Sequence, residues 1–157
     1  MVSARDVKEF LSQAYYTAVR MKTVIEQINV YRTKAMKETA AWSDTPGGSN
    51  STASLQAIWI EKAVDLQEQW KEMAGELIER DKFSHSLINM LSDERQKCML
   101  EDRYIWRMSW RSMEDKHHYS ERQMNNILRQ SYKSLAEIVS NDEDLEKHFR
   151  QFPTNLC

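Results

Sequence analysis

The sequence predicts an all-α protein in which a long antiparallel helical hairpin, packed as a coiled coil, precedes a C-terminal helix-turn-helix unit. Three observations lead to this fold class. The 157 residues include only three Gly and two Pro, which leaves few turn signals and favours long helices. Apolar residues recur at heptad spacing through most of residues 1–91. The last third then breaks into shorter segments that start with helix-capping residues.

The two arms of the hairpin are predicted at residues 5–42 and 54–90, joined by a loop at 43–54. The loop, SDTPGGSNSTAS, is rich in helix breakers and caps. Each arm has core positions that alternate four and three residues apart. In the first arm these are Val7, Leu11, Ala14, Ala18, Met21, Ile25, Ile28, Arg32 and Ala35. In the second they are Trp59, Ala63, Leu66, Trp70, Met73, Leu77, Arg80, Ser84, Leu87 and Leu91.

Charge favours antiparallel pairing of the two arms within one chain. Residues 1–43 carry seven basic and four acidic residues, a net +3, whereas residues 54–91 carry four and seven, a net −3. Further apolar side chains lie outside the strict seam: Phe10, Val24, Ile58 and Ile60. They leave pairing between chains, and hence a homodimer through the hairpin, open as well. A scaffold, a dimerisation arm and a docking surface for a partner protein are all compatible with such a hairpin.

The C-terminal unit is predicted at residues 92–139. Ser92, followed by Asp93 and Glu94, is typical of a helix start. Ser120 with Gln123 three residues later forms a second such signal, a capping box. We expect helices over 109–117 and 120–138, and a solvated acidic tail over 140–157.

The helix that begins at Ser120 has two chemically distinct faces, because a helix turns about 100° per residue. One face is apolar and should hold the helix on its own domain: Met124, Ile127, Leu128, Leu135 and Ile138. The opposite face is a stripe of Arg122, Asn126, Arg129 and Lys133. Arg and Asn can address phosphates and base edges in a DNA major groove. The stripe therefore predicts DNA binding.

Net charge is −2 for the whole chain, but its distribution supports the same interpretation. The span 103–133 holds seven basic and three acidic residues, a net +4. Residues 139–157 hold two basic and four acidic residues, a net −2. Positive charge thus gathers on the predicted DNA-binding unit, as phosphate contact requires.

About 45 residues of this region resemble region 4 of bacterial sigma factors, and are most similar to its small phage-encoded relatives in Gram-positive hosts. The resemblance is carried by Leu91, Ser92, Arg95, Arg103, Tyr104, Ser109, Trp110, Met113, the run YSERQ at 119–123, Ser131 and Leu135. It implies a late-gene transcription regulator that binds double-stranded DNA, with host RNA polymerase as a further partner. Residues 109–117 would be the first helix of the motif and 120–138 the recognition helix. The implied DNA contacts are Arg107, Arg111, Lys116, Ser120, Arg122, Gln123, Asn125, Asn126, Arg129 and Lys133.

The chain departs from that family at three positions. Arg107 and His118 stand where the family usually has Gly, and Glu114 stands where it usually has a small residue. We expect a positive φ at His118, which costs more for a residue with a Cβ than for Gly. The charge of Glu114 must reach solvent or find a cation such as Arg111 or Lys116.

Other function classes have weaker support in the sequence. Glu114, His117 and His118 do not match a zinc-binding spacing, and the two Cys form no disulfide framework, so we expect no metal, no cofactor and no enzyme. No apolar run is long enough to span a membrane and no signal peptide is recognisable, so a cytoplasmic protein is expected. Two alternatives stay open. One is an interaction module that contacts RNA polymerase or a sigma factor without DNA. The other is a small terminase-like packaging factor that binds DNA as a ring.

Overall fold

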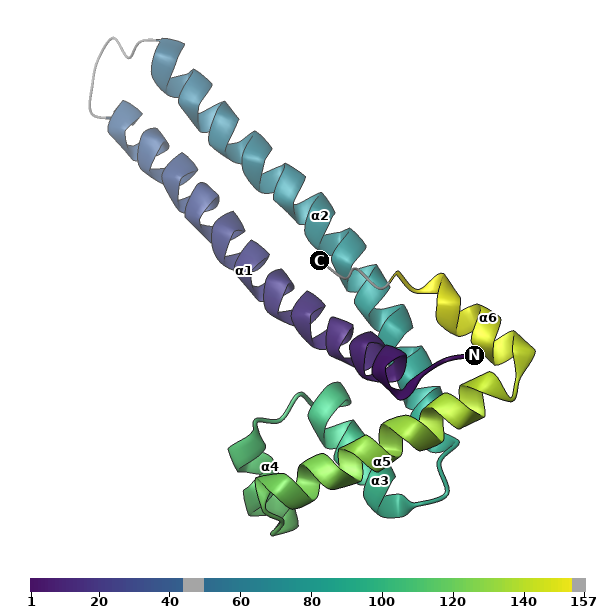
Figure 1. Cartoon of the computed structure of the whole chain (residues 1–157). Helices are drawn as coiled ribbons and strands as arrows, with labels where there is room; N and C mark the ends of the chain where they lie inside the picture. Colours follow the sequence, from purple (N-terminus) through teal and green to yellow (C-terminus); the bar gives the residue numbers. More distant parts are fainter. Residues whose placement is uncertain (44–49, 154–157) are drawn as a thin grey trace. The chain divides into compact units, whose positions relative to one another are not determined.

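The computed structural model describes the backbone of residues 1–43 and 50–153, and the side chains of residues 1–37 and 54–153. Six α-helices and one π-helical turn, η1, make up this part of the chain, and no strand occurs in it. The elements are α1 (Ala4–Ser43), α2 (Asn50–Asn89), α3 (Glu94–Leu100), η1 (Glu101–Ile105), α4 (Trp110–His117), α5 (Glu121–Ser140) and α6 (Glu143–Gln151) (Figure 1). The all-α prediction is confirmed. No described helix is long and apolar enough to cross a membrane.

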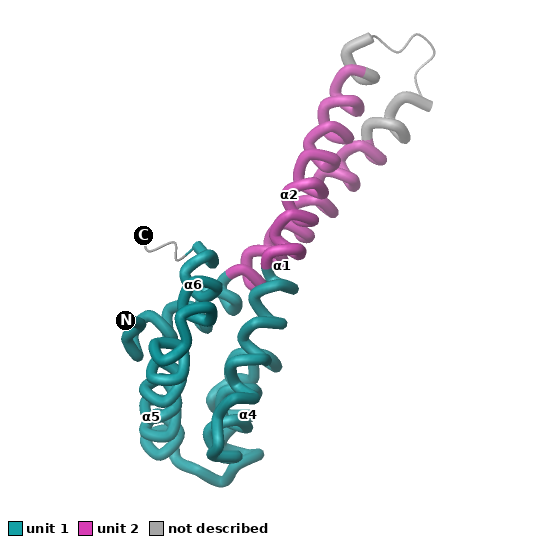
Figure 2. The backbone as a smooth tube through the Cα atoms, turned by 90° about the vertical axis from the view of Figure 1, so that its right-hand side faces the viewer, with its two compact units in different colours: residues 1–16, 77–157 teal, residues 17–76 magenta. Residues whose placement is uncertain are grey.

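The chain forms two compact units (Figure 2). Unit 2 comprises residues 17–76, and unit 1 comprises residues 1–16 and 77–157. The predicted boundary at residue 91 therefore differs from the structure, because both ends of the hairpin belong to the same unit as the C-terminal helices. The predicted loop at 43–54 is also too long. Ser43 and residues 50–54 are helical, and residues 44–49 lie outside the described part.

In unit 2 the two long helices pack through heptad positions. The rings of Tyr31 and Trp59 are stacked with centroids 5.7 Å apart. The ammonium groups of Lys34 and Lys62 lie 4.5 and 5.3 Å from the Trp59 ring centroid, a cation–π arrangement. The seam predicted for the second arm is confirmed, since each of its positions from Trp59 to Leu91 is buried or half-buried.

The seam predicted for the first arm is wrong at two of its nine positions, Ile25 and Arg32. Val24 is 5% exposed, whereas the predicted Ile25 is 42% exposed. Arg32 is likewise exposed, while its neighbour Tyr31 is half-buried. Residues three and four apart both fall on one helix face, so two adjacent apolar residues fit the spacing equally well. Which of the two is buried depends on contacts with the other helix.

The core of unit 1 brings together residues from the start of α1, the C-terminal part of α2, α6 and the segment just after α6. Phe10 of α1 is fully buried and packs against Phe83, Phe149 and Phe152, at centroid distances of 5.8, 4.9 and 5.4 Å. The guanidinium of Arg80, itself buried, lies 4.9 Å from the Phe10 ring centroid and donates to the Pro153 carbonyl at 3.0 Å. Aromatic contacts of this kind add to the stabilisation that burial gives.

Two predicted boundaries in the C-terminal part need correction. Residues 140–157 were expected to be a solvated tail, but Glu143–Gln151 form α6, and its Phe149 is buried in the core. The acidic residues of this segment lie in the first turn of α6, where the helix dipole favours negative charge. The side chain of Asp142 caps this turn. The cap of α3 is Asp93, whose side chain accepts from the Arg95 backbone N–H, and not Ser92. Either residue type suits this position, so the sequence did not distinguish them.

Phe10→Ala should lower the free energy of unfolding by about 3–5 kcal/mol, because it leaves a cavity among three other aromatic rings. Ile78→Ala is the control, since Ile78 is 55% exposed on α2 of the same unit and should change stability by about 0.5 kcal/mol or less. Urea denaturation measures both. Similar losses for the two variants would contradict the packing described for Phe10.

Candidate nucleic-acid interface

Helices α4 and α5 form the helix-turn-helix that the sequence predicts. The Ser109 hydroxyl caps α4 by accepting from the Ser112 N–H at 3.2 Å. At α5 the Ser120 hydroxyl accepts from the Gln123 N–H at 3.2 Å, and the Gln123 side chain accepts from the Ser120 N–H at 2.9 Å. This reciprocal capping box is confirmed. It uses the side chains of both Ser120 and Gln123, two of the predicted DNA contacts.

Two residues with positive φ bracket α4. Arg107 has φ 55° and His118 has φ 57°, so the chain turns in the left-handed region on each side of the helix. The prediction for His118 is confirmed. Its backbone N–H donates to the Glu114 carbonyl at 2.8 Å, which closes the C-terminus of α4. A residue with a Cβ costs roughly 1–2 kcal/mol in this conformation, so other contacts must hold the two turns.

A buried carboxylate holds the turn at His118. Asp102, in η1, is 3% exposed. Its oxygens bind His117 Nε2 at 2.6 Å and Lys116 Nζ at 2.8 Å, both from the last turn of α4. The bond to Asp102 raises the pKa of Lys116, which therefore stays charged. His117 is thus a hydrogen-bonded, mostly buried residue, and among the described residues no group of three His, Cys, Asp or Glu is placed to hold a metal ion.

An ion pair holds the turn at Arg107. The guanidinium of Arg107 binds both carboxylate oxygens of Asp81 on α2, at 3.0 and 2.8 Å. It also donates to the Ile105 carbonyl at 2.9 Å. Arg107 and Lys116 are among the predicted DNA contacts, but the structure pairs both with carboxylates of the protein itself. Glu114 is exposed to solvent, which is one of the two outcomes expected for its charge.

The two faces of α5 are separated as the sequence predicts. Met124, Leu128 and Leu135 are at most 2% exposed and belong to the core of unit 1. The polar stripe on the other side is exposed along its length: Arg122, Asn126, Arg129 and Lys133. Arg111, on α4, is also exposed. The apolar face fixes α5, so the stripe is presented on a rigid helix.

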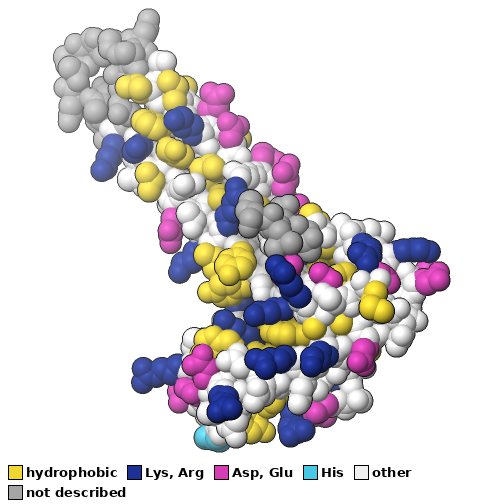
Figure 3. All heavy atoms as spheres, viewed as in Figure 1, with side chains coloured by type: hydrophobic (Ala, Val, Ile, Leu, Met, Phe, Trp, Pro, Cys, Tyr) yellow, Lys and Arg dark blue, Asp and Glu magenta, His cyan; other side chains and the backbone are white. Residues whose placement is uncertain are grey.

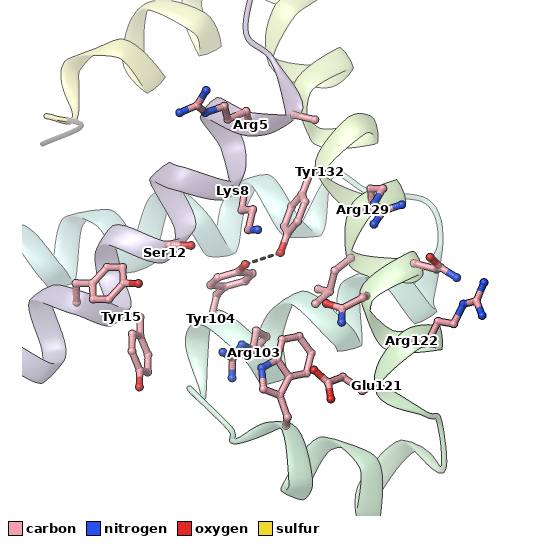
Figure 4. Close-up of a pocket in the computed structure, with 16 residues that line it drawn as sticks. Arg5, Lys8, Ser12, Tyr15, Arg103, Tyr104, Glu121, Arg122, Arg129 and Tyr132 are labelled. Atoms are coloured by element: carbon pink, nitrogen blue, oxygen red, sulfur yellow. Dashed lines mark hydrogen bonds between the residues drawn. The ribbon is translucent and has the colours of Figure 1, made fainter. Parts of the chain in front are cut away.

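Part of the stripe lines a groove of about 1170 Å³ in unit 1. On the α5 side the lining includes Arg122, Asn125, Asn126 and Arg129, and on the α1 side Ala4, Arg5, Lys8, Ser12, Tyr15 and Tyr16. Arg103, Tyr104 and Trp110 also line the groove, and Figure 4 shows the first two between α1 and α5. Lys133 is not among the lining residues. The α1 side was missed by sequence reasoning, because nothing in a regular polar helix face indicates which distant helix it will lie beside.

The groove is strongly basic. Five of its lining residues are Lys or Arg, and one, Glu121, is acidic. In the space-filling view, Lys and Arg side chains flank the hollow (Figure 3). Lys8, Arg122 and Arg129 form no ion pair with any residue in the described part of the chain. The guanidinium of Arg103 stacks 4.3 Å from the Trp110 ring centroid and donates to the Met108 carbonyl at 2.9 Å. Such a surface attracts an anionic partner.

Local contacts hold the tyrosines and the start of α1 at the groove. The hydroxyls of Tyr104 and Tyr132 are hydrogen-bonded to each other (Figure 4). Burial raises the pKa of Tyr132, so this hydroxyl stays neutral. At the start of α1 the Ser3 N–H donates to the Asp6 carboxylate at 2.8 Å, and this bond lowers the pKa of Asp6. The cap fixes the first turn of α1, which carries Arg5.

Asp102→Ala should destabilise the protein by about 1–3 kcal/mol, because it leaves the buried side of His117 without its acceptor and removes the partner of Lys116. Asp115→Ala is the matched control, since Asp115 is exposed one residue before Lys116 and should cost about 0.5 kcal/mol or less. Both are measured by urea denaturation. Equal stability of the two variants would argue against Asp102 as the residue that holds α4.

Position 118 offers a second test. His118→Gly removes the strain of a positive φ but adds flexibility to the unfolded chain, so stability should stay within about 1 kcal/mol of the wild type or rise. His118→Val places a β-branched residue in the same conformation and should be clearly less stable. Thermal unfolding compares the two variants. Equal stability of the Val and Gly variants would contradict the left-handed backbone conformation at residue 118.

Comparisons with protein-family models, with curated proteins and with solved structures find no match to this chain. Its function must therefore be inferred from its own residues. The features that bear on function are the capped helix-turn-helix, the exposed stripe on α5 and the basic groove beside it.

Proposed function

We propose that this protein is a DNA-binding transcription regulator of the phage-encoded type that resembles sigma-factor region 4, and that α5 reads promoter DNA in the major groove. The observation that carries the proposal is the exposed stripe of Arg122, Asn126 and Arg129 on a helix whose opposite face is buried. In helix-turn-helix proteins the second helix lies in the major groove, and its N-terminal residues contact the base edges. The three residues lie in the first half of α5.

The chemistry of the stripe suggests a division of roles. Arg pairs bidentately with guanine and Asn with adenine, so Arg122, Asn126 and Arg129 are the base-reading residues in this proposal. Lys133 lies further along α5, where a point charge suits a phosphate. We propose Arg111 on α4 as a second phosphate contact, since the first helix of such motifs crosses the DNA backbone.

Local charge makes the proposal compatible with an acidic chain. The whole chain carries −2, but residues 103–133 carry +4, and α5 presents its cations on one face. Phosphate contact depends on the local field and not on net charge. A regulator of promoters would act in the cytoplasm of a bacterial host, next to RNA polymerase.

The test starts with selection of a preferred duplex from a random library by the wild-type protein. Arg122→Ala and Asn126→Ala should each weaken binding to the selected duplex by roughly 1–3 kcal/mol, and much less on random duplex, because they remove base contacts. Lys133→Ala should weaken both duplexes alike. The charge-matched control is Lys147→Ala on α6, which should have little effect. Fluorescence anisotropy measures the affinities of the wild type and the four variants for both duplexes.

Salt dependence checks the phosphate contacts of the same complex. With four to six contacts, log K should fall with log salt at a slope of about −4 to −5. The proposal fails if no duplex is bound at low salt, or if the Arg122 and Asn126 variants stay folded and keep full preference. Host polymerase retained by such a protein would then favour the interaction module, and light scattering that shows a ring with bound DNA would favour the packaging factor. A dimer with sequence preference fits the present proposal.

A further inference from the structure

The first four turns of α1 form the opposite wall of the groove beside α5, although the sequence assigns them to a hairpin arm. We propose that Arg5, Lys8 and Ser12 of α1 bind the sugar-phosphate backbone of the duplex whose major groove α5 enters. This inference rests on the proposed function and adds a phosphate-binding surface to it. It assigns a role in DNA binding to a segment more than a hundred residues away in sequence from the recognition helix.

The dimensions of a helix in DNA lead to this placement. An α-helix with side chains is about 10–12 Å across and the major groove is about 12 Å wide, so the two DNA backbones run close along both sides of the helix. The groove of about 1170 Å³ lies along the stripe itself, because Arg122, Asn126 and Arg129 of α5 line it together with residues of α1. A duplex whose base edges contact these three residues therefore brings one of its backbones to this groove.

The α1 wall has the groups that contact phosphate. Lys8 makes no ion pair within the described chain, and in Figure 4 it lies on the other side of Tyr132 from Arg129 of α5. Arg5 pairs with Glu9 at 2.8 Å, but its side chain is 80% exposed, and exposed pairs of this kind are weak enough to be exchanged for a phosphate. The Ser12 hydroxyl adds a neutral donor.

The spacing of Arg5, Lys8 and Ser12 also fits the phosphates of one strand of a DNA duplex. Arg5, Lys8 and Ser12 follow each other at intervals of three and four residues, which places them on one face of α1. Seven residues of helix rise about 10 Å. One strand of duplex carries a phosphate about every 3.4 Å along the axis, so the wall is long enough for about two or three phosphates. Tyr15 and Tyr16 extend the same lining with exposed hydroxyl-bearing rings.

The experiment compares two double variants that each remove two positive charges from unit 1. Arg5→Gln with Lys8→Gln removes the charges of the α1 wall. Lys82→Gln with Lys147→Gln removes two exposed charges on α2 and α6 that do not line the groove. Salt titrations of binding are run with a labelled random duplex of about three helical turns and with the selected duplex. Urea denaturation confirms that both variants are folded.

The α1 variant should have a salt slope that is shallower than the wild-type slope by about 2, since each phosphate contact contributes about 0.9. The slope of the control variant should match the wild type. The ratio of affinities for selected and random duplex should stay unchanged in the α1 variant, because phosphate contacts carry no sequence information.

Each other outcome overturns the inference in a recognisable way. A wild-type slope in the α1 variant, with the effects of Arg122→Ala intact, overturns this inference and leaves the proposed function standing. No duplex binding by the wild type overturns both. A loss confined to single-stranded DNA, with duplex binding unaffected, would mean that the groove holds a single strand and that α1 does not contact the duplex.

Discussion

The geometry of the candidate site depends on one buried carboxylate. Asp102 lies in the π-helical turn η1 and binds both His117 and Lys116 at the end of α4. The next residue, His118, has the positive φ that turns the chain into α5. A strained turn persists only where its surroundings hold it, and here the Asp102 contacts lie directly before the strained residue. Because α5 begins at Glu121, three residues after His118, the direction of α5 depends on this carboxylate.

The N-terminal turns of α1 contribute both to the core of unit 1 and to the lining of the groove. Its inward face carries Phe10, which packs on rings from α2, α6 and the segment after α6. Its other face carries Lys8 and Ser12, which line the groove beside α5. The period of the helix separates the two sets, so the same contacts that bury Phe10 also set the position of the groove wall. This explains why both hairpin ends belong to unit 1 and why the hairpin cannot be treated as an arm attached to a separate C-terminal domain.

Much of the fold could be predicted because its signals are local. The heptads of α2, the capping box of Ser120 and the two faces of α5 each depend on residues within a few turns of one another. Most of the errors share a different cause, since they depend on contacts between distant segments. The choice between Val24 and Ile25 depends on the partner helix, α6 depends on a core that accepts Phe149, and the pairing of Arg107 with Asp81 joins α2 to the turn before α4. The groove was unpredictable for the same reason, because α1 and α5 are far apart in sequence.

The ten predicted DNA contacts fall into three groups in the structure. Arg107 and Lys116 are paired with carboxylates of the protein, and Ser120 and Gln123 cap α5. The other six are exposed on α4 and α5.

The tryptophan indole N–H signals offer the most direct measurement of where DNA binds. Trp110 lines the groove in unit 1, whereas Trp59 and Trp70 lie in unit 2. Each signal in a proton–nitrogen correlation spectrum can be assigned by a Trp→Phe variant and followed while the selected duplex is added. Binding along α5 and in the groove predicts a saturable shift of the Trp110 signal, with the Trp59 and Trp70 signals unchanged. Shifts of Trp59 or Trp70 with Trp110 unchanged would place the ligand on unit 2 and contradict the account.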